Sequence, residues 1–174
     1  MLSKTTFAIT FRYTDETYRN IENFRDTNDI IVVNSPTPIT CKIPRFIVTE
    51  EDKPPIRPNI YLFEMNNTQN KVINIIKMSL KQPMRKEYKI HDKKFYNRLS
   101  YFGKSIIERS SLEEPYHIFM MEYIDHILFK GKDHSKRASG FTLIPQKKIQ
   151  HTREVILEFI QDVFKVSREH QNEQ

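Results

Sequence analysis

The sequence has one cysteine, three glycines and no tryptophan among its 174 residues, and it has no long apolar run. The lone cysteine, Cys41, cannot form an internal disulfide, which favours a reducing compartment. No apolar segment approaches the roughly 20 residues that cross a bilayer, so no membrane partner is expected. The first residues carry Lys4 and alternate without a continuous apolar centre, unlike a secretory signal. We therefore expect an intracellular protein, nuclear or cytoplasmic.

The motifs of common catalytic and metal centres are also missing. There is no CxxC pair, no G-x-S-x-G and no G-x-G-x-x-G. Cys41 lies in a proline-rich apolar stretch, where a small buried side chain is expected. The carboxylates of Glu113 and Glu114 lie in a predicted loop and lack the burial that acid–base pairs need. His117 and His126 are expected on strands, as ordinary core or surface residues. The sequence predicts a protein that is not an enzyme and binds neither metal nor cofactor.

The length and composition predict one domain over residues 1–174. A chain of this size with 38% hydrophobic residues can build a single core, and twelve Phe and eight Tyr make that core aromatic. Residues 36–58 contain six prolines, which favours edge strand and loop over central sheet. The tail 168–174 is expected to fray.

Alternation and turn residues predict several strands. Phe7, Ile9, Phe11 and Tyr13 share one face of a strand over 7–13. A second short strand is expected at 30–33. The apolar runs 60–65 and 72–78 flank an Asn-rich turn and predict a hairpin. Residues 116–129 are read as one or two more strands, and 141–145 as a last short strand or turn.

Helices are predicted at both ends of the chain. Thr14-Asp15-Glu16 combines an N-cap hydroxyl with acids in the first turn, so a short helix follows the first strand. Residues 150–170 carry an apolar stripe at helical spacing. The predicted fold is therefore α+β, a curved mixed β-sheet or small β-barrel with an N-terminal short helix and a C-terminal amphipathic helix.

The stripe of the C-terminal helix has two interpretations. It packs on the sheet as core, or it is a docking face for a partner protein. In the second case the docking residues are Val155, Phe159 and Val163.

The net charge of +6 is unevenly distributed. Residues 71–104 hold ten basic and two acidic residues, a local excess of eight positive charges. Aromatic residues are interleaved with these cations, the pattern that single-stranded RNA or DNA needs, because cations neutralise phosphates and rings stack on bases. The candidate nucleic-acid-binding residues here are Arg85, Lys86, Lys93, Lys94, Tyr96, Arg98, Tyr101 and Phe102.

A second basic segment, KGKDHSKRASG at 130–140, holds two of the three glycines. It lacks the order of a nucleotide P-loop. Glycines would let its backbone N–H groups approach an anion. We interpret this segment, with its cations Lys130, Lys132, Lys136 and Arg137, as a phosphate-contacting loop, and a mobile charged turn is the alternative.

The order of these pieces resembles the PUA-like domains of the YTH and EVE families. The similarity lies in FAITFRYTDETYRNIENF, in the hairpin IYLFEMNNTQNKVINIIKM, and in KGKDHSKRASGFTLIP followed by the last helix. It implies recognition of RNA or DNA, often with a modified base in an aromatic cage. It places the ligand near Arg12, Tyr13 and Thr14. Family cages are built mainly from Trp, so here Tyr and Phe would have to form the cage.

Two other interpretations stay open. One is an OB-type barrel that binds nucleic acid and uses its closing helix to pair with a partner. The other is a structural subunit of a larger complex, whose basic face meets an acidic protein.

Overall fold

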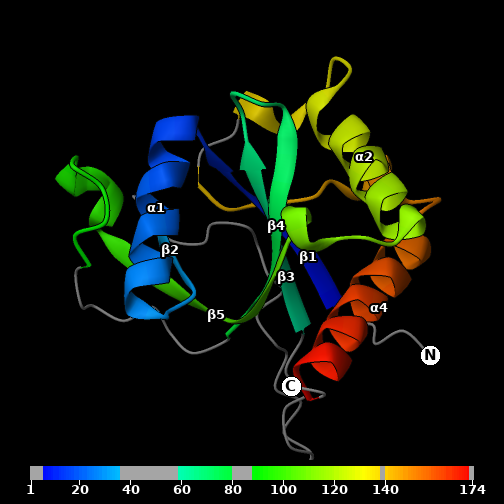
Figure 1. Cartoon of the computed structure of the whole chain (residues 1–174). Helices are drawn as coiled ribbons and strands as arrows, with labels where there is room; N and C mark the ends of the chain where they lie inside the picture. Colours follow the sequence, from blue (N-terminus) through cyan, green and yellow to red (C-terminus); the bar gives the residue numbers. More distant parts are fainter. Residues whose placement is uncertain (1–5, 36–58, 80–87, 138–139, 173–174) are drawn as a thin grey trace, which may run out of the picture.

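The computed structural model describes residues 6–35, 59–79, 88–137 and 140–172, and it confirms the α+β class (Figure 1). Within these residues six strands form one curled sheet in the order β2-β5-β4-β3-β1-β6. Neighbouring strands are antiparallel, except that β1 and β3 are parallel. The strands are β1 (Thr6–Tyr13), β2 (Val32–Ser35), β3 (Asn59–Asn66), β4 (Lys71–Met78), β5 (Leu99–Glu108) and β6 (Thr142–Leu143).

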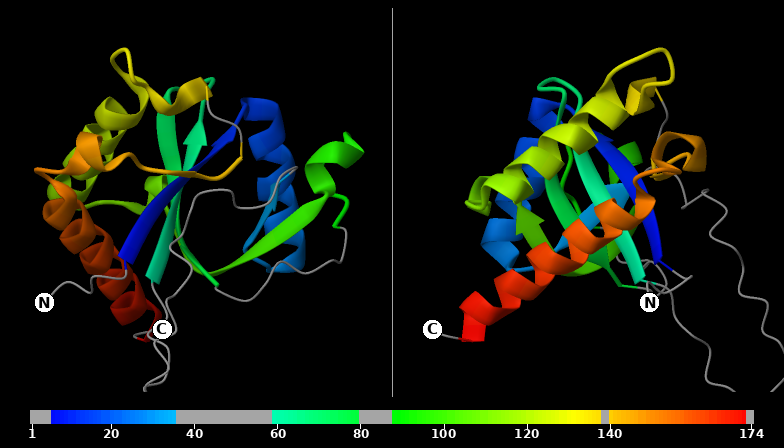
Figure 2. Two further views of the ribbon diagram at one scale, coloured as in Figure 1. Left: turned by 180° about the vertical axis from the view of Figure 1, so that it is seen from behind. Right: turned by 90° about the vertical axis from the view of Figure 1, so that its right-hand side faces the viewer.

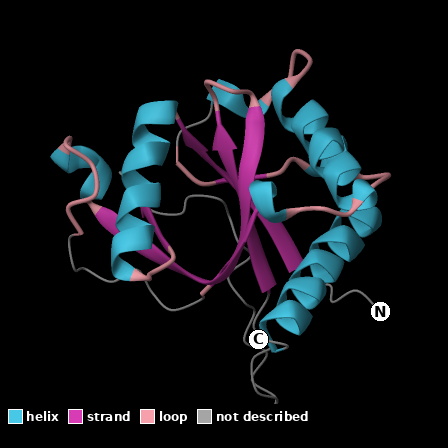
Figure 3. Cartoon of the chain, in the orientation of Figure 1, coloured by secondary structure: helices cyan, strands magenta, loops and turns pink. Residues whose placement is uncertain are grey.

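The helices cover the two faces of the sheet. One helix, α1, lies on the side opposite to α2 and α4, with the sheet between them (Figures 1 and 2). Short helical turns occur in the connections (Figure 3). The α-helices are α1 (Asp15–Asn28), α2 (Pro115–Phe129), α3 (Gln146–Ile149) and α4 (Arg153–Asn172), and the 3₁₀ turns are η1 (Lys94–Asn97), η2 (Arg109–Ser111) and η3 (Ser135–Arg137).

The sheet therefore separates two apolar cores. Successive residues of a strand point to opposite faces, so Phe63 and Ile75 join the core beneath α2 and α4, while Leu62 and Ile76 join the core beneath α1. All four side chains are fully buried. Burial on both faces explains why the predicted hairpin, now β3 and β4, is apolar along almost its whole length.

The first helix begins where the sequence predicted. Thr14 is its N-cap and forms a reciprocal capping pair with Thr17, and Asp15 and Glu16 follow in the first turn. The helix ends at Asp29, whose backbone is left-handed with φ of 52°. This local chemistry needs no tertiary contact, which is why the sequence reveals it.

The prediction of strands at 116–129 is wrong, because this segment is the helix α2. Pro115 stands in its first turn, where a missing N–H costs nothing. The residues buried on it recur at helical spacing: His117, Met120, Met121, Ile124, Leu128 and Phe129. Ile118 and Phe119 are exposed apolar residues, so the segment is apolar on nearly every side and its period is hard to read.

The C-terminal helix is core, and the docking interpretation is wrong for two of its three residues. Phe159 is completely buried and Val163 is 3% exposed, both within the core beneath α2 and α4. Val155 alone of the three lies at the surface, 42% exposed. The helix continues through Asn172, so the tail predicted to fray from Arg168 is helical up to that point. The proline-rich segment 36–58 with Cys41 lies outside the described residues.

Gly103 lies where β5 passes closest to its neighbours. Its N–H donates to the carbonyl of Ile31 (2.9 Å), and a Cβ on Gly103 would overlap the Cγ2 atoms of Ile31 and Ile76. We expect Gly103→Ala to destabilise the fold by about 1–3 kcal/mol through overpacking. Urea unfolding should show this loss. Ile31→Ala in the same chain should recover part of it, and a purely additive double variant would contradict the steric explanation.

Among the residues that the structure describes, no helix has the length and apolar character to cross a bilayer.

Candidate functional site

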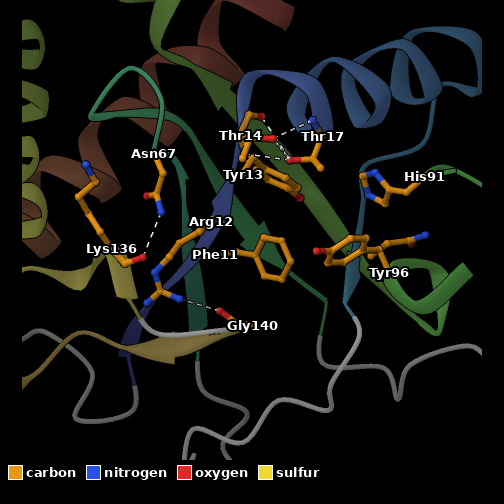
Figure 4. A pocket seen from close by; sticks show the side chains of 11 residues that line it. Phe11, Arg12, Tyr13, Thr14, Thr17, Asn67, His91, Tyr96, Lys136 and Gly140 are labelled. Carbon is orange, nitrogen blue, oxygen red and sulfur yellow. Dashed lines mark hydrogen bonds between the residues drawn. The ribbon is translucent and has the colours of Figure 1, made fainter. Parts of the chain in front are cut away.

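A cavity of about 240 Å³ opens at the carboxyl end of β1 (Figure 4). Five parts of the chain meet there: the β1–α1 junction, the strand β2, the β3–β4 turn, the segment 88–97, and the basic segment after α2. The lining residues are Phe11, Arg12, Tyr13, Thr14, Thr17, Asn34, Asn67, His91, Tyr96, Lys136 and Gly140.

Aromatic rings form one side of this cavity. Phe11 is buried and packs against Tyr13 and Phe141, at ring centroid distances of 4.9 and 5.0 Å. Tyr96 is 38% exposed, and its hydroxyl end points toward the ring of Phe11 (Figure 4). Its neighbour Phe95 is 61% exposed. The cavity therefore has an apolar wall and one exposed aromatic residue, Tyr96, among its lining residues.

The segment 88–97 is held in place by the buried amide of Asn97. Its Oδ1 accepts the backbone N–H groups of Ile90 (3.0 Å) and His91 (2.9 Å), and its Nδ2 donates to the carbonyl of His91 (2.5 Å). Asn34 of β2 donates to the same Oδ1 (3.2 Å) and accepts from Ser100 (2.8 Å). This network ties the segment that carries His91 and Tyr96 to the sheet edge formed by β2 and β5.

Arg12 holds the basic segment against β1. Its guanidinium donates to the carbonyl of Ser135, to the carbonyl of Gly140 (3.3 Å) and to the hydroxyl of Thr142 (3.2 Å). Burial lowers the pKa of Arg12 to about 10. Because protein acceptors occupy this guanidinium, it positions the loop and is poorly placed to meet a phosphate as well.

Tyr13 belongs to a buried polar network beneath the cavity. Its hydroxyl donates to Glu64 (3.1 Å), a fully buried carboxylate that also accepts from Arg25 (2.5 and 2.8 Å) and Asn74 (2.8 Å). Burial, followed by the charge of Glu64, raises the pKa of Tyr13 well above its usual value. Arg25 also donates twice to the carbonyl of Val32, so α1 is tied to both β2 and β3.

Two residues that line the cavity each carry a buried side-chain atom without a hydrogen-bond partner. Asn67 Oδ1 and His91 Nδ1 are the buried side-chain polar atoms without a partner among the described residues, and both residues line this cavity. Asn67 Nδ2 donates to the carbonyl of Lys136 (3.1 Å), which leaves its Oδ1 as a pure acceptor. Burial lowers the pKa of His91, which favours the neutral ring.

The structure brings some predicted site residues together and separates others. Arg12, Tyr13, Thr14, Tyr96 and Lys136 all line the cavity. The ammonium group of Lys136 extends away from the aromatic side chains (Figure 4). The cations nearest Tyr96 in the chain are exposed to solvent: Lys93, Lys94 and Arg98. Lys132 lies in a different hollow, with Lys130, Gly131, Asp133 and Lys148.

The prediction that Tyr101 forms part of the binding face is wrong. Tyr101 is 7% exposed and packs edge-on against Phe141 (4.8 Å) in the core beneath α1. Phe102 is half-buried and packs against Tyr88 (6.0 Å) and the same core. Arg85, Lys86 and the side chain of Arg137 lie outside the described residues.

Sequence reasoning missed five residues that line the cavity. Asn34 stands in a short strand and Asn67 in a turn, and their local sequence gives no sign of a shared site. The sequence places Phe11 on one face of the first strand, and it gives no sign that Thr17 or His91 belongs to a site. Only the tertiary fold brings the five together: Phe11, Thr17, Asn34, Asn67 and His91.

No protein-family model, no curated protein and no solved structure matches this chain. Within the part of the chain that the structure describes, no three His, Cys, Asp or Glu side chains lie close enough to hold a metal ion.

Proposed function

We propose that this protein is a non-enzymatic nucleic-acid-binding module, which takes one base of single-stranded RNA or DNA into the cavity at the end of β1. The observation that carries the proposal is that, among the described residues, the two buried side-chain polar atoms without a partner, Asn67 Oδ1 and His91 Nδ1, belong to residues of this cavity. A buried polar atom without a partner costs about 1–3 kcal/mol, and a ligand with a matching polar edge would remove that cost once the side chain turns its polar atom toward the cavity.

A nucleobase has the required combination of properties. Its faces stack on aromatic rings such as Tyr96, and its edge carries N–H donors for an acceptor such as Asn67 Oδ1. The exposed cations Lys93, Lys94 and Arg98 supply charge for the phosphates beside that base. The resemblance to YTH and EVE domains extends the proposal to a modified base, with Tyr and Phe in place of the family's Trp.

The first experiment is a fluorescence-anisotropy titration of the full chain with short single-stranded RNA, single-stranded DNA and duplex at two salt concentrations. We expect binding that weakens with salt and favours one single-stranded probe over the duplex. Absence of binding at low salt overturns the proposal. In that case, co-purification of an acidic protein would favour the structural-subunit interpretation.

The sharpest variant is Tyr96→Ala. Loss of one base–aromatic stack costs about 1–3 kcal/mol, so the dissociation constant for the preferred strand should rise about 5- to 150-fold. The matched control is Tyr116→Ala, which removes a tyrosine that is 49% exposed on α2, outside the cavity. Equal affinities for the two variants would exclude Tyr96 from the site.

A further inference from the structure

A second hollow, of about 360 Å³, lies between α4 and the sheet. It is spatially separate from the cavity at the end of β1. Tyr61 lies in β3 and Asn67 directly follows its last residue, six residues further on, which is roughly 20 Å at about 3.3 Å per extended residue. The lining residues are Tyr61, Lys77, Lys104, Ser105, Gln161, Phe164 and Arg168.

Strand register explains how these residues meet. Tyr61 of β3 is paired with Lys77 of β4, and Lys77 is paired with Ser105 of β5, so the three form one row across the sheet. The helix above supplies Gln161, Phe164 and Arg168, which share a face at spacings of three and four residues. The ring of Phe164 packs against Tyr61 at 5.5 Å.

Lys77 stands at a position where the fold calls for an apolar residue. The preceding row on the same face is Phe63, Ile75 and Ile107, and all three belong to the core beneath α2 and α4. Lys77 continues this face by one step and is half-buried. Burial, together with the charges of Arg168 and Lys104, lowers its pKa.

The charge of this hollow is uncompensated. Lys77, Lys104 and Arg168 come from three different elements, and none forms an ion pair with a residue that the structure describes. Among the residues that the structure describes, no carboxylate lines the hollow. Arg168 uses its Nε to reach the carbonyl of Phe164 (3.1 Å), which leaves its terminal nitrogens for other acceptors. Lys104 and Arg168 are exposed and screened by water, so the repulsion falls mainly on the half-buried Lys77, and an anion in the hollow would relieve it.

We propose that the hollow binds a phosphate group. Its dianionic form offers the charge and the several acceptor oxygens that three cations require, and the guanidinium of Arg168 matches the spacing of two phosphate oxygens. Tyr61, Ser105 and Gln161 add neutral donors around the same space. The phosphate belongs either to a free or small phosphorylated ligand or to a nucleic-acid backbone, and the chemistry is the same for both.

The test measures the melting temperature of the full chain in sodium phosphate and in sodium chloride at equal pH and ionic strength. We expect phosphate to raise the melting temperature saturably above the value in chloride. Lys77→Met should raise the melting temperature in chloride by about 2–4 °C, because it removes a half-buried, repelled cation, and it should abolish the response to phosphate. Equal melting temperatures of the wild-type protein in the two salts overturn the proposal.

Two further variants keep this test decisive. Lys165→Met removes an exposed lysine of the same helix, paired with Glu169, and should keep the full phosphate response. Arg168→Gln should lose it even if Lys77→Met does not fold. A phosphate response that survives Arg168→Gln also overturns the proposal.

An oligonucleotide arm distinguishes the two sources of phosphate. If Arg168→Gln weakens binding of a single-stranded oligonucleotide as well, the phosphate belongs to a nucleic-acid backbone. If it affects only inorganic phosphate, the ligand is small. Tyr96→Ala should leave the phosphate response unchanged. The phosphate site can therefore fail its test while oligonucleotide binding holds, and oligonucleotide binding can fail while the phosphate response holds.

Discussion

Arg25→Ala should destabilise the fold by about 3–5 kcal/mol. Removing one partner of a buried ion pair leaves the other charge buried and uncompensated, and Glu64 is fully buried, with the side chain of Arg25 only 10% exposed. Tyr13 and Asn74 would still donate to Glu64, but neither carries a positive charge. The substitution also removes both bonds from Arg25 to the carbonyl of Val32.

Urea unfolding of the wild-type protein and three variants checks this expectation. Arg19→Ala, an exposed arginine of the same helix, is the matched control and should change stability by less than about 0.5 kcal/mol. The double variant Arg25→Met with Glu64→Leu should recover part of the loss, because it leaves no uncompensated buried charge. The recovery stays incomplete, since the donors of Tyr13 and Asn74 lose their acceptor. A loss under 1 kcal/mol in Arg25→Ala would show that Glu64 does not depend on this partner.

The sequence predicts those parts of the fold whose cause is local. The hairpin of β3 and β4 is marked by two apolar runs around Asn66 and Asn67, and α1 is marked by its own cap at Thr14. The sequence predicts strands over 116–129 and not the helix α2, because Ile118 and Phe119 add apolar residues to the exposed side of this helix. These residues hide the period of its buried face. Its local signal, Pro115 at the start, is weak compared with that run of apolar residues.

The candidate site could be predicted only in outline. The end of β1 follows from the strand–helix junction, and the resemblance pointed to Arg12, Tyr13 and Thr14 there. Whether an aromatic faces a ligand or the core depends on strand register, and Tyr101 is buried because it is paired with Val33 and faces Phe141. The nucleic-acid role of the cavity stays a prediction. The residues that distinguish it, Asn67 and His91, meet only through tertiary contacts.

Asn97→Ala should damage both stability and binding. The amide of Asn97 satisfies the backbone N–H groups of Ile90 and His91 and the amide of Asn34 at once. Each buried donor left without a partner costs about 1–3 kcal/mol, so we expect a total loss of about 3 kcal/mol or more. Asn23→Ala, which removes an exposed amide on α1, is the matched control and should be close to neutral.

The binding effect of Asn97→Ala separates positioning from contact. Asn97 does not line the cavity, yet it fixes the segment that carries His91 and Tyr96. At a temperature where the variant is still folded, its affinity for the preferred single strand should fall at least as far as in Tyr96→Ala, since two lining residues lose their positions. In the Asn97→Ala background, adding Tyr96→Ala should then cost much less than it does alone. Two fully additive losses would mean that Tyr96 holds its place without this network, and that the cavity is organised by the β1–α1 junction instead.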